Sequence, residues 1–427
     1  MSTPSDVLVV GASAAGLAVT ESLRRKGYRG RITLLGEEAG APYDRPPLSK
    51  QVLAGTWEAE RTQLRTRDVL DALDAELVLG ERAVAFDAAA RTVRTASGAE
   101  LRAEAVVLAT GLHARRLPGL SGAAGVHVLR TLDDAGRLRE ELLKAERVVV
   151  VGDGVLGAEI AATARLMGAD VTLSGPQTAP MRAQLGDDVA QLLAALHREH
   201  GVRLRPDSPV DGLETAGGRV TGVRTVGDVS TVTDVSTVGG DRTVGGDRTV
   251  GGGEVLPADL VVEAVGGTPA TDWLADSGLA LRDGVVCDSR CRAADGVYAA
   301  GDVARFHHEG LGRSLRLENR TNATEQATLV AANILGEDRP YSPVPYFWTD
   351  QFGVRIQVYG LPAPTATVRI VEGAVEQGRF VARYVDSEDR PVAVLGWNMP
   401  KQARLHSQHL LGRYAPAPRP APATAPR

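Results

Sequence analysis

The stretch "VVVVGDGVLGAE", residues 148–159, decides the fold class. Its run of valines predicts a buried parallel strand, and Gly152-x-Gly154-x-x-Gly157 follows the strand at once. In a dinucleotide-binding βαβ unit the first glycine makes a tight turn. The second lets the backbone approach a pyrophosphate, and the third lets the helix pack closely on the strand. The stretch therefore predicts a dinucleotide site, to which Val155 and Leu156 contribute backbone atoms.

A related stretch, "VLVVGASAAGLAV", occupies residues 7–19. Gly11 and Gly16 hold the first and third positions, while Ser13 replaces the middle glycine with another small residue. We predict strands at 7–10 and 31–35 around a helix at 17–26, and strands at 147–151 and 170–173 around a helix at 158–167. Glu37 follows the second strand of the first unit, where an acid can accept hydrogen bonds from an adenosine ribose.

The second unit lacks the corresponding acid, because Gly175 stands after its second strand. Loss of that acid removes a repulsion against the 2′-phosphate of NADPH. No arginine replaces it directly, and the nearest is Arg182. The choice between NADH and NADPH therefore stays open at this stage.

Chain length, net charge and cysteine content limit the classes of protein to which this sequence can belong. A chain of 427 residues predicts several domains, and a net charge of −5 gives no general attraction to nucleic acid or anionic membranes. We expect no secretory signal at the N-terminus and no membrane span. With only two cysteines, Cys287 and Cys291, the composition suits a reducing cytoplasm, and we interpret both as packing residues.

Several motifs in order extend over residues 5–400: "VGASAAG", "PYDRPPLSK", "LATG", "VVVVGDGVLGAEIAA", "GVYAAGDVARF", "TNATEQ" and "PYFWTDQF". Together they resemble those of the FAD-dependent, NAD(P)H-linked ferredoxin reductases that serve haem monooxygenases and ring-hydroxylating oxygenases. The resemblance implies an α/β fold with two Rossmann-like dinucleotide-binding domains, arranged as in glutathione reductase, and a small α/β C-terminal interface domain.

The implied division gives residues 1–112 and 268–331 to a discontinuous FAD domain and 113–267 to the NAD(P)H domain. Residues 332–413 form the interface domain, and 414–427 a disordered Pro/Ala-rich tail. Strands that end at Thr110-Gly111 and at Gly266-Gly267 mark the crossings between domains, and a hairpin precedes the first. The repetitive stretch 221–253 is interpreted as an expanded hairpin tip, with a partner-binding loop as the alternative.

The resemblance also implies site residues. Lys50 lies beside the flavin, where a cation stabilises the charge of the reduced ring, and Glu159 pairs with it; the alternative for Glu159 is an acid that complements a helix dipole. The residues implied to bind FAD are Gly11, Ser13, Ala15, Gly16, Glu37, Arg45, Lys50, Ala83, Thr110, Gly111, Arg130, Gly301, Asp302, Arg320 and Trp348. Those for NAD(P)H are Gly152, Gly154, Val155, Leu156, Gly157, Glu159 and Gly266.

The implied reaction moves a hydride from NADH or NADPH to FAD and then single electrons to an acidic two-iron ferredoxin. No cysteine lies in the first glycine-rich helix and the segment that follows it, or in "PYDRPPLSK", which argues against a disulfide or peroxide reductase. The alternatives are an NADH oxidase, a quinone or dye reductase, and a flavin redox sensor. Oligomeric state is open between a monomer and a weak homodimer.

Ferredoxin docking calls for a basic rim. Candidates are Arg305, Arg313, Arg316 and Arg320, and a second group formed by Arg61, Arg65 and Arg67, with ordinary surface charge as the alternative. Arg320 stands where many relatives carry an aromatic residue. We interpret His307 and His308 as exposed loop residues and predict no metal site.

Overall fold

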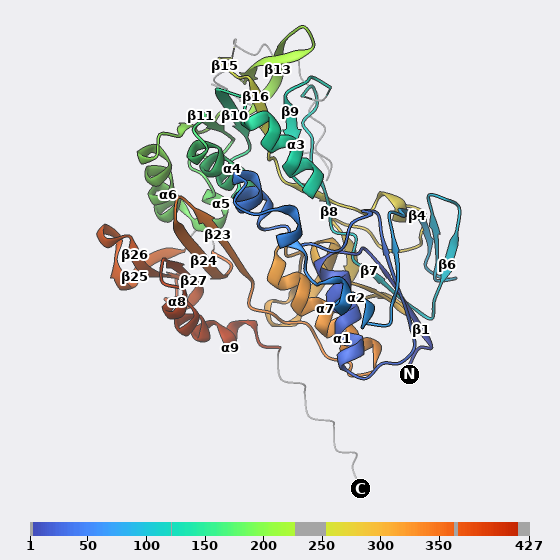
Figure 1. Ribbon diagram of the computed structural model, residues 1–427. Helices are drawn as coiled ribbons and strands as arrows, with labels where there is room; N and C mark the ends of the chain where they lie inside the picture. Colours follow the sequence, from blue (N-terminus) through green and yellow to red (C-terminus); the bar gives the residue numbers. More distant parts are fainter. Residues whose placement is uncertain (1–2, 121, 227–252, 363–365, 417–427) are drawn as a thin grey trace, which may run out of the picture.

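The computed structural model describes residues 3–120, 122–226, 253–362 and 366–416. Its first large sheet has the strand order β19-β20-β7-β1-β2-β3. These strands are β1 (Asp6–Val10), β2 (Arg31–Gly36), β3 (Glu76–Leu79), β7 (Ala105–Leu108), β19 (Arg292–Ala294) and β20 (Val297–Ala299). All neighbours in this sheet are parallel except β19 and β20. Helices α1 (Ala14–Arg25) and α7 (Arg320–Ile334) pack against one another beside it (Figure 1).

The second large sheet is wholly parallel, in the order β12-β11-β10-β16-β9. Its strands are β9 (Val126–Val128), β10 (Arg147–Val151), β11 (Asp170–Ser174), β12 (Arg203–Arg205) and β16 (Leu260–Glu263). The accompanying helices are α3 (Leu132–Leu142), α4 (Val155–Leu166), α5 (Arg182–Leu185) and α6 (Asp187–Glu199). Valines 148–151 of β10 are buried, as expected for a central strand covered on both faces.

A third sheet is antiparallel, in the order β23-β24-β27-β26-β25. It comprises β23 (Tyr346–Gln351), β24 (Val354–Gly360), β25 (Thr367–Ala374), β26 (Arg379–Val385) and β27 (Pro391–Trp397), followed by α8 (Pro400–Ser407) and α9 (Leu411–Tyr414). Ile356, Tyr384 and Leu395 share one apolar cluster with Val189 and Leu193 of α6. The C-terminal sheet is therefore anchored on the helices of the second parallel sheet.

Smaller elements complete the fold. Three-stranded sheets are formed by β4 (Ala83–Asp87), β5 (Thr92–Thr95) and β6 (Glu100–Arg102), by β13 (Val210–Ala216), β14 (Arg219–Thr225) and β15 (Val255–Pro257), and by β18 (Val285–Cys287), β21 (Ala304–His308) and β22 (Arg313–Leu315). Helix α2 spans Arg67–Asp71, and a π-helix, η1, spans Leu48–Val52. The predicted hairpin ahead of Thr110 is β5 and β6.

The two predicted crossings meet in space. β8 (Leu112–Ala114) and β17 (Gly267–Pro269) pair antiparallel, so the chain leaves the first sheet and returns to it through one two-stranded ribbon. This pairing supports the division at 112 and 268, which stays a proposal. The α/β class with two Rossmann-like units is confirmed.

Both glycine-rich helices begin earlier than predicted. α1 begins at Ala14 and α4 at Val155, three residues ahead of the predicted starts. The prediction placed the third glycine before the helix, whereas Gly16 and Gly157 lie in the first turn. There a Cβ would overlap the carbonyl of Gly11 or Gly152. Gly16 and Gly157 therefore allow the helix to approach the strand closely, and each lies within the helix without interrupting it.

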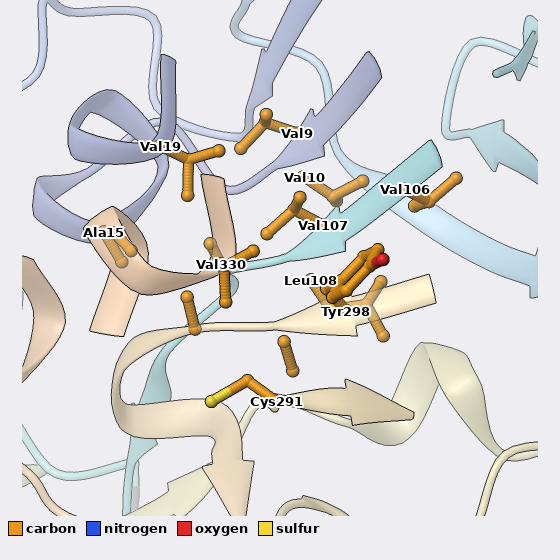
Figure 2. Packing of buried hydrophobic residues seen from close by; sticks show 14 of the residues in the cluster. Val9, Val10, Ala15, Val19, Val106, Val107, Leu108, Cys291, Tyr298 and Val330 are labelled. Carbon is orange, nitrogen blue, oxygen red and sulfur yellow. The ribbon is translucent and has the colours of Figure 1, made fainter. Parts of the chain in front are cut away.

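The structure also tests the predictions made for the two cysteines and for His307 and His308. Figure 2 shows Cys291 beneath the valines of β1 and β7 and Val330 of α7; both cysteines are buried and free, as expected for packing residues. His307 is exposed, but the prediction for His308 was wrong: it is fully buried, contacts the Pro343 carbonyl at 2.9 Å and accepts from the Leu311 amide.

The tail boundary at 414 was also wrong, because Tyr414 is 2% exposed and packs against Leu410 and Val394. Its hydroxyl accepts from the Leu361 amide at 3.1 Å and holds the end of the chain on the third sheet. Of the repetitive stretch 221–253, residues 221–225 belong to β14, and 227–252 lie outside the described residues.

Candidate functional site

The N-termini of α1 and α4 carry no side-chain cap. Ser13 precedes α1 and Gly154 precedes α4, and neither position provides a side-chain hydrogen bond to the first amides of its helix. By contrast, Thr131 and Asn319 cap α3 and α7. Free amides at a helix N-terminus bind anions, and a Cβ on Gly154 would meet only open space. Both modules therefore retain the feature that holds a dinucleotide pyrophosphate.

The Ser13 hydroxyl is engaged by a side chain from another segment. Arg45 donates to Ser13 Oγ, to Glu38 Oε1 at 2.7 Å and to the Arg130 carbonyl at 3.3 Å. Burial lowers the pKa of Arg130, and the neighbouring Arg45 cation adds to that effect. Two guanidinium groups so close to an uncapped helix end are suited to a pyrophosphate. The predicted positions of Arg45 and Arg130 thus fit FAD.

Asp302 lies at the start of a short turn after β20, beside Gly301, whose φ is +78°. Its carboxylate has one ionic partner within the described part of the chain, Arg130, at 3.9 Å. Burial raises the pKa of Asp302, and the Arg130 cation offsets only part of that rise. A carboxylate with spare acceptor capacity is matched to hydroxyl donors such as those of a flavin ribityl chain.

Three parts of the chain meet at Glu159, in the second turn of α4. Lys50 Nζ of η1 donates to Glu159 Oε2 at 2.7 Å, and Ser49 Oγ donates to the same oxygen at 2.5 Å. Thr349 of β23 donates to Oε1 at 2.8 Å. The Lys50 and Glu159 side chains are 13% and 7% exposed. These bonds, rather than a helix dipole alone, hold the carboxylate, so the predicted pairing is present.

A hydrogen-bonded chain continues from this pair into the interior. Gln351 Nε2 donates to Thr349 Oγ1 at 2.9 Å, and Gln351 Oε1 contacts His197 Nε2 at 2.7 Å. His197 lies on α6, so the chain links the C-terminal sheet to the second module twice. The sequence analysis included Gln351 only as part of the motif "PYFWTDQF" and gave no role to Ser49, Thr349 or His197. Their spacing carries no signal, since the contacts span more than 100 residues.

His197 gives a pH-dependent stability that can be measured. Burial lowers the pKa of His197 from 6.5 to about 4. Between these values the unfolded chain binds a proton that the folded protein excludes. The contribution of the neutral ring to the free energy of unfolding is therefore complete above pH 6.5. It falls by about 3 kcal/mol as the pH drops to 4.

Chemical denaturation at pH 7.5 and pH 4.5 checks this expectation. His197→Phe removes the titration, so its loss of stability between the two pH values should be smaller than that of the wild type. His200→Phe is the matched control, because His200 is exposed at the C-terminal cap of the same helix and stacks on Phe352, whose ring also meets His197 edge-on. Equal pH slopes for all three proteins would contradict the assignment.

The other predicted residues occupy varied positions. Thr110 Oγ1 donates to the Ala270 carbonyl at 3.0 Å, beside Gly111, and Ala15 lies close to Gly301. Trp348 is half-buried on β23 and stacks on Tyr346. Ala83 starts β4 and Gly266 precedes β17. Glu37 is exposed, whereas Glu38 bonds both Arg45 and Tyr43.

Most arginines of the predicted basic rim are already paired. Arg305 and Arg316 bind Asp283 at 3.3 and 2.9 Å. Arg320 binds Asp44 at 2.5 Å, so this predicted FAD residue is also engaged in an ion pair. In the second group, Arg65 pairs with Glu21 and Arg67 with Asp71.

Arg313 and Arg61 are exposed and have no ion pair within residues that the structure describes; Arg61 lies over the Trp57 ring at 4.2 Å. The arginine count of these segments therefore overstates the positive charge that they offer to a partner.

Comparison with known proteins adds independent evidence. Residues 5–327 match the family model "Pyridine nucleotide-disulphide oxidoreductase", and residues 346–424 match "Reductase C-terminal". The chain belongs to the pyridine nucleotide-disulphide oxidoreductase family. It is 34% identical to rhodocoxin reductase of Rhodococcus erythropolis, over 88% of this chain and 82% of the relative. With putidaredoxin reductase of Pseudomonas putida it shares 33% identity, over 97% and 93%.

Solved structures agree. The ferredoxin reductase for the CYP199A2 system from Rhodopseudomonas palustris superposes with a TM-score of 0.83 at 32% identity, covering 92% of this chain and 91% of that one. The reductase in a covalent putidaredoxin reductase–putidaredoxin complex gives 0.85 at 32%, covering 96% and 94%. The predicted family, fold and enzyme class are thus confirmed: the protein is an oxidoreductase that uses FAD and NAD(P)H.

Among the residues that the structure describes, no helix combines the length and the apolar composition that a membrane span needs. Nor do three or more His, Cys, Asp or Glu side chains in these residues lie together where they could hold a metal ion.

Proposed function

We propose that this protein passes electrons from NAD(P)H through FAD to a two-iron ferredoxin, which in turn serves a haem monooxygenase or a ring-hydroxylating oxygenase. The observation that carries the proposal is the buried Lys50–Glu159 pair, at the place where both dinucleotide modules and the C-terminal sheet meet. Bound FAD supplies the conversion of a two-electron donor into single-electron steps. The names of the relatives, which include reductases of rhodocoxin and putidaredoxin, support the choice of acceptor.

The roles of this chain's residues follow from the geometry. Amides of α1, together with Arg45 and Arg130, would bind the FAD pyrophosphate, and Asp302 its hydroxyls. Amides of α4 would bind the nicotinamide dinucleotide. Lys50 would offset the negative charge of the reduced flavin, while Ser49 and Thr349 hold Glu159 so that Lys50 keeps a fixed position. We place the reaction in the cytoplasm, in keeping with two free, buried cysteines.

Cytochrome c reduction tests the choice of acceptor. The FAD-loaded protein is assayed with NADH and with NADPH, each with and without a two-iron ferredoxin. We expect strong stimulation by the ferredoxin. Arg313 and Arg61 are the two exposed arginines of the predicted basic rim that have no ion pair in the described residues. We therefore expect Arg313→Glu and Arg61→Glu to raise the KM for ferredoxin, with little effect on the rate of dye reduction. Rapid NAD(P)H oxidation that ferredoxin leaves unchanged would favour an oxidase or dye reductase, and slow flavin bleaching without turnover would favour a redox sensor.

A further inference from the structure

The carboxyl end of β11 holds a carboxylate, although the residue at that place is Gly175. Asp153, from the Gly152-Asp153-Gly154 loop after β10, occupies the space that a side chain on Gly175 would need. A Cβ built on Gly175 would overlap Asp153 Cγ and Oδ2. Gly175 does not have the positive φ that Gly152 has, so its backbone accepts a side chain. The three atoms nearest to such a Cβ all belong to Asp153, so glycine at 175 makes room for this side chain. An acid from another position in the sequence therefore stands at the expected site.

Asp153 is held in a defined orientation. Its side chain accepts from the Gln177 amide at 2.9 Å and from Gln177 Nε2 at 2.8 Å. Its own carbonyl accepts from the Met181 amide at 2.8 Å. The residue is 6% exposed. A carboxylate with two oxygens has about four acceptor sites, so two bonds to Gln177 leave capacity for ribose hydroxyl donors.

Two of the three arginines near this site are already paired with carboxylates. Arg198 and Arg205 line a small pocket together with Asp153, Gln177 and Thr178. Arg205 is paired with Glu254 at 2.8 Å, and Arg182 is paired with Asp187. Arg198 has no ion pair within the described ranges, but it is exposed at the end of α6. A 2′-phosphate bound at the end of β11 would therefore lie against the carboxylate of Asp153, and of these three arginines only the exposed Arg198 has no ion pair in the described ranges.

We propose that Asp153 accepts hydrogen bonds from the adenosine ribose and selects NADH over NADPH. The proposal rests on the proposed function only in that the second module binds a nicotinamide dinucleotide. It moves the ribose-binding acid from the end of β11 to the loop after β10. A site that bonds a hydroxyl and repels an added phosphate discriminates by both effects.

Equilibrium binding of NAD⁺ and NADP⁺ to the FAD-loaded protein, measured by calorimetry, tests the proposal directly. We expect the wild type to bind NAD⁺ more tightly. Asp153→Asn should weaken NAD⁺ binding by about 10- to 100-fold, the usual effect of losing a hydrogen bond to a charged group. It should also reduce the ratio of NAD⁺ affinity to NADP⁺ affinity. The ratio of kcat/KM for NADH and NADPH in dye reduction should move in parallel.

A relocation variant separates this role from a structural one. Asp153→Gly frees the space above Gly175, and the double variant Asp153→Gly with Gly175→Glu returns an acid to the end of β11. We expect the double variant to recover preference for NAD⁺ that Asp153→Gly has lost. Wild-type preference for NADP⁺, or an Asp153→Asn variant with unchanged selectivity, would overturn the proposal. Either result could accompany normal ferredoxin stimulation, so it would leave the proposed function standing.

Discussion

Replacing Lys50 with alanine slows flavin reduction by NAD(P)H about 100- to 1,000-fold, the expected cost of removing one preorganised electrostatic group from a reacting centre. The wild-type cation is held by Glu159 at 2.7 Å and Ser49 at 3.2 Å in a site that is 13% exposed at the lysine. Stopped-flow measurement of the fall in flavin absorbance reads the rate directly. A rate equal to that of the wild type would remove Lys50 from the mechanism.

Two further variants separate catalysis from stability. Lys50→Ala leaves the buried Glu159 carboxylate without a counter-cation, which by itself destabilises the fold. Lys50→Ala combined with Glu159→Gln removes both charges, so the thermal midpoint should recover while flavin reduction stays slow. Lys26→Ala is the matched control, because Lys26 also makes a 2.6 Å ion pair, with Glu337, far from the glycine-rich loops. It should leave the reduction rate unchanged.

Replacing Asp302 with alanine weakens FAD binding by about 10- to 100-fold, as expected for the loss of hydrogen bonds to a charged acceptor. The same change leaves Arg130 without its carboxylate partner, so less negative charge remains to offset the repulsion between the guanidinium groups of Arg45 and Arg130. FAD affinity is measured by titrating the flavin-free protein and following fluorescence.

Asp302→Asn keeps the size of the side chain and half of its acceptor capacity, so it should retain flavin better than Asp302→Ala. Asp259→Ala, which removes the carboxylate that pairs with Arg147 at 2.6 Å in the second module, should leave FAD binding unchanged. An Asp302→Ala protein that purifies with a full complement of FAD would contradict the proposal that this carboxylate binds FAD.

The glycine-rich motifs predicted the two modules because their requirements are local. A strand of valines followed by Gly152 and Gly157 can be recognised within twelve residues, and the reason for each glycine is close contact within the same unit. The same holds for Gly11 and Gly16. Only the helix starts were misplaced, since sequence periodicity does not reveal that the third glycine lies inside the first turn.

Predictions about single polar residues depended on distant partners and fared less well. Arg316 is neutralised by an ion pair with Asp283. His308, at the end of β21, is buried and contacts the carbonyl of Pro343. No local pattern distinguishes these residues from exposed ones. Their environment is set by segments that lie 33 and 35 residues away in the chain.

The sequence by itself therefore determined the family, the two dinucleotide modules and the pairing expected for Lys50 and Glu159. Only the tertiary structure decided what surrounds that pair, because Thr349 and His197 reach it through the packing of the C-terminal sheet on α4 and α6. It also decided what Gly175 means. The absence of an acid in the sequence corresponds to a carboxylate in space, since Asp153 folds over the end of β11 and fills the position.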